Sequence, residues 1–264
     1  PGGRRRGDGV MAGPRRGGIL FSGGSTHILA MDTSGSEGSL AIGRAGPEGR
    51  SMEVLVESKI EAEREQASRL IPEVQRLLDD LEIGPADLGG LVVGSGPGSF
   101  TGIRVGVGTA KGMAWALEIP LWAFSSLAGA AAAVEVDPLR PRTVLFDARG
   151  DRLYAAAYRM FDQTVETLME PCATSVREVL DGDLIPPGSL VLGHGALRHR
   201  NILEGPGNSI LDLPWGGASA SGLLRLLSMK PSVPPLKDPG RWEPDYLRET
   251  GAVRLPKYRG GTGG

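Results

Sequence analysis

The sequence has little cysteine, little histidine and no long apolar run. Among its 264 residues there is one cysteine, Cys172, which excludes an internal disulfide and a cage of thiolate metal ligands. The three histidines, His27, His194 and His199, are too scattered for a zinc site. No apolar stretch approaches the roughly 20 residues that a membrane-spanning helix needs. We therefore expect a soluble, cytoplasmic protein without a membrane partner.

An excess of charge of either sign is also missing. Lys and Arg together number 29, and Asp and Glu number 31. This balance argues against a surface built for nucleic acid alone, so any contact with RNA is expected to be local or shared with a partner. The length exceeds the usual size of one domain, about 100–200 residues, which predicts two domains or one large one.

Composition divides the chain into three regions. Residues 1–25 are mostly Gly, Arg, Pro and Ser, which predicts a disordered tail because they offer so little apolar surface to bury. Residues 26–136 form a first lobe and residues 137–264 a second, with the boundary at the proline-rich and charged stretch DPLRPR. The second lobe ends in a proline-rich tail that we expect to run extended over the surface. The pattern leaves open that a helix at 218–229 packs back on the first lobe.

The periodicity of apolar residues orders the first lobe as three antiparallel strands followed by alternating helices and strands, a mixed α/β sheet. The first helix contains Pro72, so it starts near Ser68 or is kinked there. The expected elements are strands 27–34, 38–46 and 52–58, helix 63–81, strand 88–95, helix 101–117, strand 120–124 and a helix capped by Ser125.

The second lobe opens with an echo of the first. TVLFDARGDRLYAAAYRM repeats the order of ILAMDTSGSEGSLAIG: a buried strand that ends in Asp, a turn with Gly, and a returning strand. This long-period repeat predicts a duplicated fold with a cleft between its halves. The further elements expected are helix 175–182, strand 189–195, a short strand 209–213 and helix 218–229.

The first hairpin carries Asp32 beside Thr33, Ser34 and Ser36. A carboxylate at a strand end beside hydroxyl groups can hold magnesium and turn backbone amides toward a phosphate, as in two-lobed ATPases and sugar kinases. An Asx or Ser/Thr turn that merely closes the hairpin fits the same residues. The residues alone leave both interpretations open.

The second hairpin carries Asp147, Arg149 and Asp151. It is the counterpart that would supply an opposing phosphate contact. Arg149 and Arg152 crowd this turn, and Gly150 is its only glycine, so little amide surface is open. We favour a structural turn here.

The glycine-dense stretch GSGPGSFTGIRVGVGTAKG does not match the common nucleotide loops. Lys111 stands ten residues past Thr101, so the P-loop spacing fails. The run at Gly94, Gly96 and Ser99 has serine in its third position, and no acidic residue follows at the distance that dinucleotide sites need. Ser99 and Thr101 remain suited to capping a helix, where open amides can also bind an anion.

The helix that follows has two ridges of small residues. An interior glycine costs about 0.5–1 kcal/mol relative to alanine, so another interaction must compensate. Packing on the helix's own sheet would use one ridge, whereas two ridges favour a subunit interface, because small residues let helices approach closely. The first ridge is Gly102, Gly106, Ala110 and Ala114, the second is Gly108, Gly112 and Ala116, and Arg104, Lys111 and Glu118 mark one solvated stripe.

Five stretches resemble the bacterial TsaB (YeaZ) family in order and spacing: DTSGSEGSLAIG, REQASRLIPEVQRLL, GSGPGSFTGIRVGVGTAKGMAWALEIPLWAFSSL, FDARGDRLYAAAY and EPDYLRE. The resemblance covers residues 28 to about 250. It implies the two-lobed actin/Hsp70/sugar-kinase-like (ASKHA) fold, an α/β architecture of duplicated mixed-sheet domains.

The resemblance implies a non-catalytic scaffold or activator subunit. In that family it serves the formation of N6-threonylcarbamoyladenosine in tRNAs that read codons beginning with A. It dimerises with the catalytic TsaD subunit, the ATPase TsaE joins the assembly, the isolated subunit forms a homodimer, and tRNA is met only through the complex. No cofactor of its own is implied, and ATP with magnesium would belong to partner subunits or the complex interface. The catalytic paralogue holds a metal through an HxxxH pair, which these histidines do not form.

The resemblance also implies that helices 101–117 and 68–81 meet the partner. Many members carry His where this chain has Gln66, which would change ring nitrogens to an amide at that contact. The expected interface residues are Gly102, Arg104, Gly106, Thr109, Ala110, Met113, Ala114, Gln66, Arg69 and Leu70, and the residues of a possible vestigial phosphate or nucleotide site are Asp32, Thr33, Ser34, Ser99 and Asp147.

Two other classes of function are weighed against the scaffold. One is an ATP-dependent kinase or hydrolase that uses Asp32 and Asp147 across the cleft. The other is a peptidase, suggested by the old M22 glycoprotease grouping, for which the sequence offers no set of nucleophile, base and metal.

Overall fold

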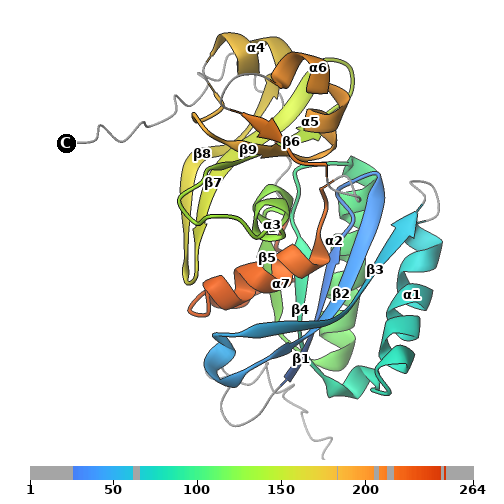
Figure 1. Cartoon of the computed structure of the whole chain (residues 1–264). Coiled ribbons are helices and arrows are strands. Elements are labelled where there is room, and N and C mark those ends of the chain that lie inside the picture. Colours follow the sequence, from blue (N-terminus) through green and yellow to red (C-terminus); the bar gives the residue numbers. More distant parts are fainter. Residues whose placement is uncertain are drawn as a thin grey trace, which may run out of the picture.

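Two sheets of five strands each form the frame of the part of the chain that the structure describes (Figure 1). The predicted tail, residues 1–25, lies outside the described residues. The computed structural model describes residues 26–61, 66–182, 184–204, 208–212, 217–244 and 247.

The first sheet has the strand order β3-β2-β1-β4-β5. The pairs β1/β2 and β2/β3 are antiparallel, which confirms the predicted meander, and β1/β4 and β4/β5 are parallel. Its strands are β1 Thr26–Asp32, β2 Glu37–Ala45, β3 Met52–Glu61, β4 Leu88–Gly94 and β5 Leu121–Phe124.

The second sheet repeats this topology. Its order is β8-β7-β6-β9-β10, with β6/β7 and β7/β8 antiparallel and β6/β9 and β9/β10 parallel. The duplicated mixed sheets confirm the predicted α/β fold of the actin/Hsp70/sugar-kinase type. Its strands are β6 Arg142–Asp147, β7 Arg152–Phe161, β8 Thr164–Ser175, β9 Leu190–Leu192 and β10 Ser209–Ile210.

Helices α1 and α2 cover the outer face of the first sheet (Figure 1). In β1, Leu29 and Met31 point toward these helices, and Ile28 and Ala30 point to the opposite face, as the two-residue period of a strand requires. Helix α1 (Gln66–Asp80) contains Pro72 in its interior, and α2 (Phe100–Leu117) matches the helix predicted for 101–117 within one residue.

The last helix of each lobe packs on the sheet of the other lobe. Helix α3 (Ser126–Ala132) follows β5 but contacts β6 and β7, and α7 (Ala220–Met229) follows β10 but contacts β1 to β4. The two cross so closely that a Cβ at Gly222 would overlap the carbonyl oxygen of Gly129. Figure 1 shows both between the sheets. One hydrophobic core therefore joins the lobes, with Trp122 from one and Phe146 from the other, so separating them exposes apolar surface.

The outer face of the second sheet is covered by short helices, α4 (Val176–Asp181), α5 (His194–Arg198) and α6 (Arg200–Leu203). The remaining described elements are two 3-10 turns, Pro47–Gly49 and Pro85–Asp87. No helix among the described residues is long and apolar enough to span a bilayer.

Candidate functional site

The first hairpin, for which the sequence leaves open a ligand site or a structural turn, is buried. Asp32, Thr33 and Ser34 are at most 2% exposed. Asp32 Oδ1 accepts hydrogen bonds from the Ser34 backbone N–H at 3.0 Å and from the Ser126 hydroxyl at 3.1 Å. Burial raises the pKa of the Asp32 carboxyl above its usual range, and the bonds from Ser34 and Ser126 offset part of that rise. The burial, and the Asx turn that the carboxyl group closes, favour the structural interpretation of this hairpin, and a phosphate role for Asp32, Thr33 and Ser34 stays an untested prediction.

The start of α2 occupies the space over this hairpin. The Thr33 hydroxyl donates to the Gly102 carbonyl at 2.6 Å, and the Ser99 backbone N–H donates to the Ser34 carbonyl at 2.7 Å. A Cβ at Gly98 would overlap that same carbonyl. The glycines of the loop thus let one part of the chain approach another. Ser99 caps α2, as predicted, because its Oγ accepts from the Gly102 N–H at 3.2 Å.

The first small-residue ridge of α2 faces the chain's own sheet. Gly102, Gly106, Ala110 and Ala114 are all buried, and a Cβ at Gly106 would overlap Thr33 Oγ1. Leu70 of α1 is likewise fully buried in the core. Their own lobe covers these five residues, which argues against a direct contact with a partner, and their assignment to the interface stays an untested prediction.

The second ridge faces outward. Gly108 and Gly112 are exposed, and a Cβ at either would meet no heavy atom within 4 Å. Next to them Trp115 is 84% exposed, which is unusual for so large an apolar side chain. Phe100 at the start of α2 and Ile71 on α1 are 53% and 51% exposed. We call this α1–α2 surface, with Ile71, Phe100, Gly108, Gly112 and Trp115, the open face.

The other predicted interface residues border the open face. Arg104 and Arg69 are exposed, and Thr109 and Met113 are half-buried. The Arg104 guanidinium lies 3.8 Å from the centre of the Phe100 ring, a cation–π contact. The side chain of Gln66 lies outside the described residues.

A C-terminal segment runs beside α2. Lys111 Nζ donates to the backbone oxygens of Gly240, at 3.3 Å, and of Trp242. The Leu236 backbone N–H donates a hydrogen bond to the carbonyl oxygen of Leu121, in the edge strand β5, at 2.8 Å. Lys111 was predicted to mark a solvated stripe; it instead fastens residues 236–242, which we call the strap, to the flank of α2.

The second hairpin closes in the same way as the first. Asp147 Oδ1 accepts a hydrogen bond from the Arg149 backbone N–H at 3.2 Å. Asp32 accepts the equivalent bond from Ser34, which is likewise two residues further along the chain. Its Oδ2 forms an ion pair with Arg198 at 2.6 Å. The predicted repeat is thus confirmed at the level of the turn. The ion pair agrees with the favoured structural interpretation of Asp147, and its phosphate role stays an untested prediction.

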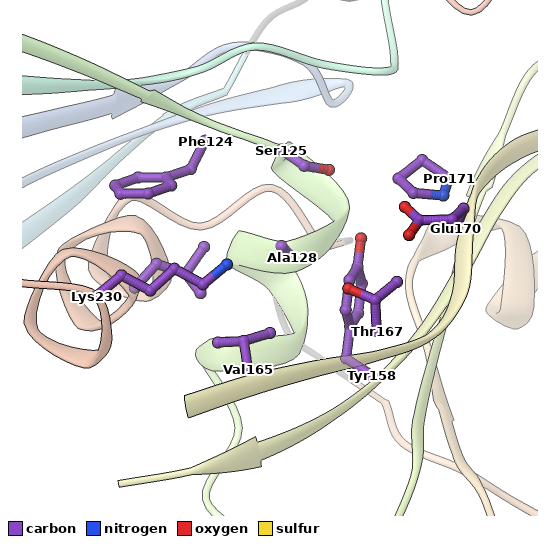
Figure 2. Close-up of a pocket in the computed structure, with 10 residues that line it drawn as sticks. Phe124, Ser125, Ala128, Tyr158, Val165, Thr167, Glu170, Pro171 and Lys230 are labelled. Carbon is purple, nitrogen blue, oxygen red and sulfur yellow. The ribbon is translucent and has the colours of Figure 1, made fainter. Parts of the chain in front are cut away.

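A pocket of about 180 Å³ does lie between the lobes, and Figure 2 shows Lys230, the residue after α7, on one side and Glu170 of β8 on the other. Neither Asp32 nor Asp147 lines it, so this pocket offers no support for the alternative in which the two carboxylates oppose each other across a cleft. Ser125 lies here at the N-cap position of α3, but its side chain makes no capping bond, contrary to prediction. The lining is Phe124, Ser125, Ala128, Tyr158, Val165, Thr167, Glu170, Pro171, Leu226 and Lys230.

The described residues contain no group of three or more His, Cys, Asp and Glu side chains able to hold a metal ion. Cys172 is 8% exposed, and burial raises the pKa of its thiol to about 11, so the thiolate nucleophile is scarce at neutral pH.

Sequence reasoning missed the most exposed parts of the open face. Neither Trp115 nor Ile71 is among the residues that the sequence predicts for the interface. A signal was present, because Trp115 follows Gly108 by seven residues and so lies above it on the same side of the helix.

Comparison with known proteins adds relatives by sequence. A family model described as "TsaD: tRNA N6-adenosine threonylcarbamoyltransferase" matches residues 56–201. The "tRNA threonylcarbamoyladenosine biosynthesis protein TsaB" of Bacillus subtilis is 33% identical over 181 residues, which are 67% of this chain and 75% of that protein. The protein of the same name from Escherichia coli is 36% identical over 101 residues, 38% of this chain and 41% of that one.

A solved structure agrees on the fold. The crystal structure described as "an uncharacterized protein with similarity to peptidase YEAZ from Pseudomonas aeruginosa" superposes with a TM-score of 0.69 at 23% identity. The match covers 84% of this chain and 100% of that one. At this identity the likeness bears on the fold alone.

Proposed function

Because the chain belongs to the TsaB (YeaZ) family of tRNA threonylcarbamoyladenosine biosynthesis proteins, we propose that it is the non-catalytic partner subunit of a threonylcarbamoyltransferase complex. In this role it binds a TsaD-type catalytic subunit. The complex then forms N6-threonylcarbamoyladenosine in tRNAs that read codons beginning with A.

The open face is the observation that carries this proposal. Gly108 and Gly112 leave a bare strip of helix surface, which lets a partner helix come close. Trp115 stands beside the strip, and a tryptophan that a partner covers is the typical centre of an interface. Phe100 and Ile71 extend the apolar surface. Two glycines in the middle of α2 lower the stability of the helix, and the binding of a partner that packs on them compensates for that loss.

The two hairpins support the non-catalytic part of the proposal. In the nucleotide-binding interpretation Asp32 and Asp147 would face a ligand. Instead Asp32 is fully buried and bonded to Ser126 of α3, and Asp147 is paired with Arg198. The shared core between the lobes also opposes the opening and closing that two-lobed kinases use.

The remaining partners follow from the family. A TsaE-type ATPase joins the assembly, and ATP with magnesium is bound by the partner subunits or at their interface. The near-neutral charge fits a subunit that meets tRNA only through the complex. In the absence of the catalytic subunit, two copies of this chain pair through the open face at high protein concentration. The complex works in the cytoplasm.

Co-purification with the cognate catalytic subunit tests the proposal, followed by a threonylcarbamoylation assay with and without this chain. Gly112→Leu is expected to abolish co-purification and the stimulation of the assay while the isolated variant keeps its thermal transition. Gly112→Ala, which adds one methyl group in open space, is the matched control and is expected to retain most binding. Normal co-purification of Gly112→Leu would contradict this face as the interface.

Titration calorimetry with ATP and magnesium tests the non-catalytic part separately. We expect no binding to the isolated chain, because Asp32 is unavailable. Micromolar binding that disappears in Asp32→Ala would instead favour the kinase or hydrolase alternative.

A further inference from the structure

The first hairpin supports the N-terminal part of α2. Its contacts with α2 and with the loop before it set the distance between that end of the helix and the first sheet. Thr33 Oγ1 bonds the Gly102 carbonyl, the Ser34 carbonyl receives the Ser99 N–H, and Gly106 rests on Thr33. The hairpin is itself anchored from below, since Asp32 is bonded to Ser126 of α3. The support is therefore stiff.

The open face lies on the opposite side of α2, over the same helical turns that contact the hairpin. Gly106 is buried against Thr33, and Gly108, two residues on, is exposed. A helix is too stiff to change its inner contacts without moving its outer ones. A displacement of α2 at Gly106 therefore moves the bare strip at Gly108 and Gly112 relative to α1, whose Ile71 belongs to the same open face.

The fit between Thr33 and Gly106 is specific to one atom. A Cβ at residue 106 would overlap Thr33 Oγ1, whereas it would lie 3.4 Å from Thr33 Cβ and 3.5 Å from Thr33 Cγ2. The hydroxyl oxygen is therefore the only atom of Thr33 that would overlap a Cβ at residue 106. Removing that oxygen makes room for the extra methyl group, and it also removes the hydrogen bond from Thr33 to the Gly102 carbonyl.

We propose that Thr33 is a positioning residue for the open face: it sets the depth at which α2 rests on the first sheet, and through α2 it tunes the affinity for the partner without touching it. This rests on the proposed function. The hairpin that resembles a phosphate loop thus positions a protein-binding helix.

A double-mutant cycle tests the proposal, with the dissociation constant for the cognate catalytic subunit measured beside the thermal transition of each free variant. Gly106→Ala is expected to weaken binding about tenfold, within the range that buried networks transmit between sites. Thr33→Ala in the same chain is expected to restore part of that affinity, because the overlapping oxygen is gone, but not all of it, because the bond to the Gly102 carbonyl is lost as well. Thr33→Ser keeps the hydroxyl and is expected to bind like the parent protein.

Gly195→Ala is the control for a loss of stability alone. It is a glycine in α5 whose Cβ would lie 2.7 Å from Leu153 Cδ2, so it strains the second lobe and not the support of α2. It is expected to lower the thermal transition without changing the dissociation constant.

Two outcomes would overturn the positioning role: unchanged binding by Gly106→Ala, or weakened binding that Thr33→Ala does not restore even in part. Failure of the proposed function is distinguishable, because the parent protein itself would then not bind the catalytic subunit.

Discussion

Gly106 and Gly108 are two residues apart on α2 and have opposite surroundings. A Cβ at Gly106 would overlap Thr33 Oγ1, and a Cβ at Gly108 would meet no heavy atom within 4 Å. The helix therefore uses glycine for two different purposes. One glycine makes room for the chain's own hairpin, and the other leaves surface bare.

The first prediction follows from that bare surface. Gly108→Ala and Gly112→Ala should each stabilise the free protein by about 0.5–1 kcal/mol, because alanine loses less backbone entropy in a helix and nothing obstructs the added methyl group. Urea unfolding of the isolated chain, at a concentration low enough to keep it monomeric, measures the change. Destabilisation of the monomer by either variant would mean that the chain itself already covers the strip.

Much of the fold could be predicted from the sequence, and the elements that were missed have physical explanations. The strand–Asp–turn–strand repeat predicted the duplicated lobes, and Ser99 predicted the start of α2. Strand β8 was missed because it is an edge strand whose register with β7 shifts near Ala157, so its buried residues do not alternate.

The orientation of α2 was the harder problem. Both of its ridges consist of glycine and alanine, so no contrast in polarity tells which one faces the sheet. The answer depends on a contact with Thr33, about 70 residues away in the sequence, that periodicity cannot encode. The exposed Trp115 and Ile71 were missed for a related reason, since apolar residues on a helix are assigned to the core by default.

The second prediction concerns pH. The folded state keeps a proton on Asp32 at pH values where the unfolded chain, with a carboxyl pKa of about 4, has released it. The contribution of Asp32 to stability is therefore complete below that pKa and is lost as pH rises toward the raised pKa of the folded state. The substitution Asp32→Asn keeps an oxygen for the bonds from Ser34 and Ser126 and removes the titrating group.

Unfolding of the parent protein and of Asp32→Asn should accordingly be compared between pH 4 and pH 8. The free energy of unfolding of the variant minus that of the parent is expected to grow as pH rises. All other titrating groups are common to both chains and cancel. Parallel curves would show that Asp32 is ionised in the folded protein.

The third prediction concerns the strap. Lys111→Met keeps the apolar stem of the side chain and removes the bonds to the oxygens of Gly240 and Trp242. Hydrogen exchange of the Leu236 amide, which bonds to Leu121, is expected to accelerate by about tenfold, because loss of one charged hydrogen bond costs about 1.5–3 kcal/mol when complete and less at a surface. Exchange in the buried turns of α2 around Ala110 is the internal control and should not change.

The fourth prediction concerns Trp115, which separates folding from binding most cleanly. Because its side chain is 84% exposed, Trp115→Ala removes little packing from the free protein, and the free energy of unfolding should stay within about 0.5 kcal/mol of the parent value. A tryptophan at the centre of an interface typically contributes about 2 kcal/mol or more, so the affinity for the catalytic subunit should fall about thirtyfold. Leu180→Ala, which removes an apolar side chain that is 45% exposed on α4, is the matched control and should leave that affinity unchanged. Equal affinities of Trp115→Ala and the parent would place the partner elsewhere, and equal losses in both variants would point to a general effect of surface hydrophobicity.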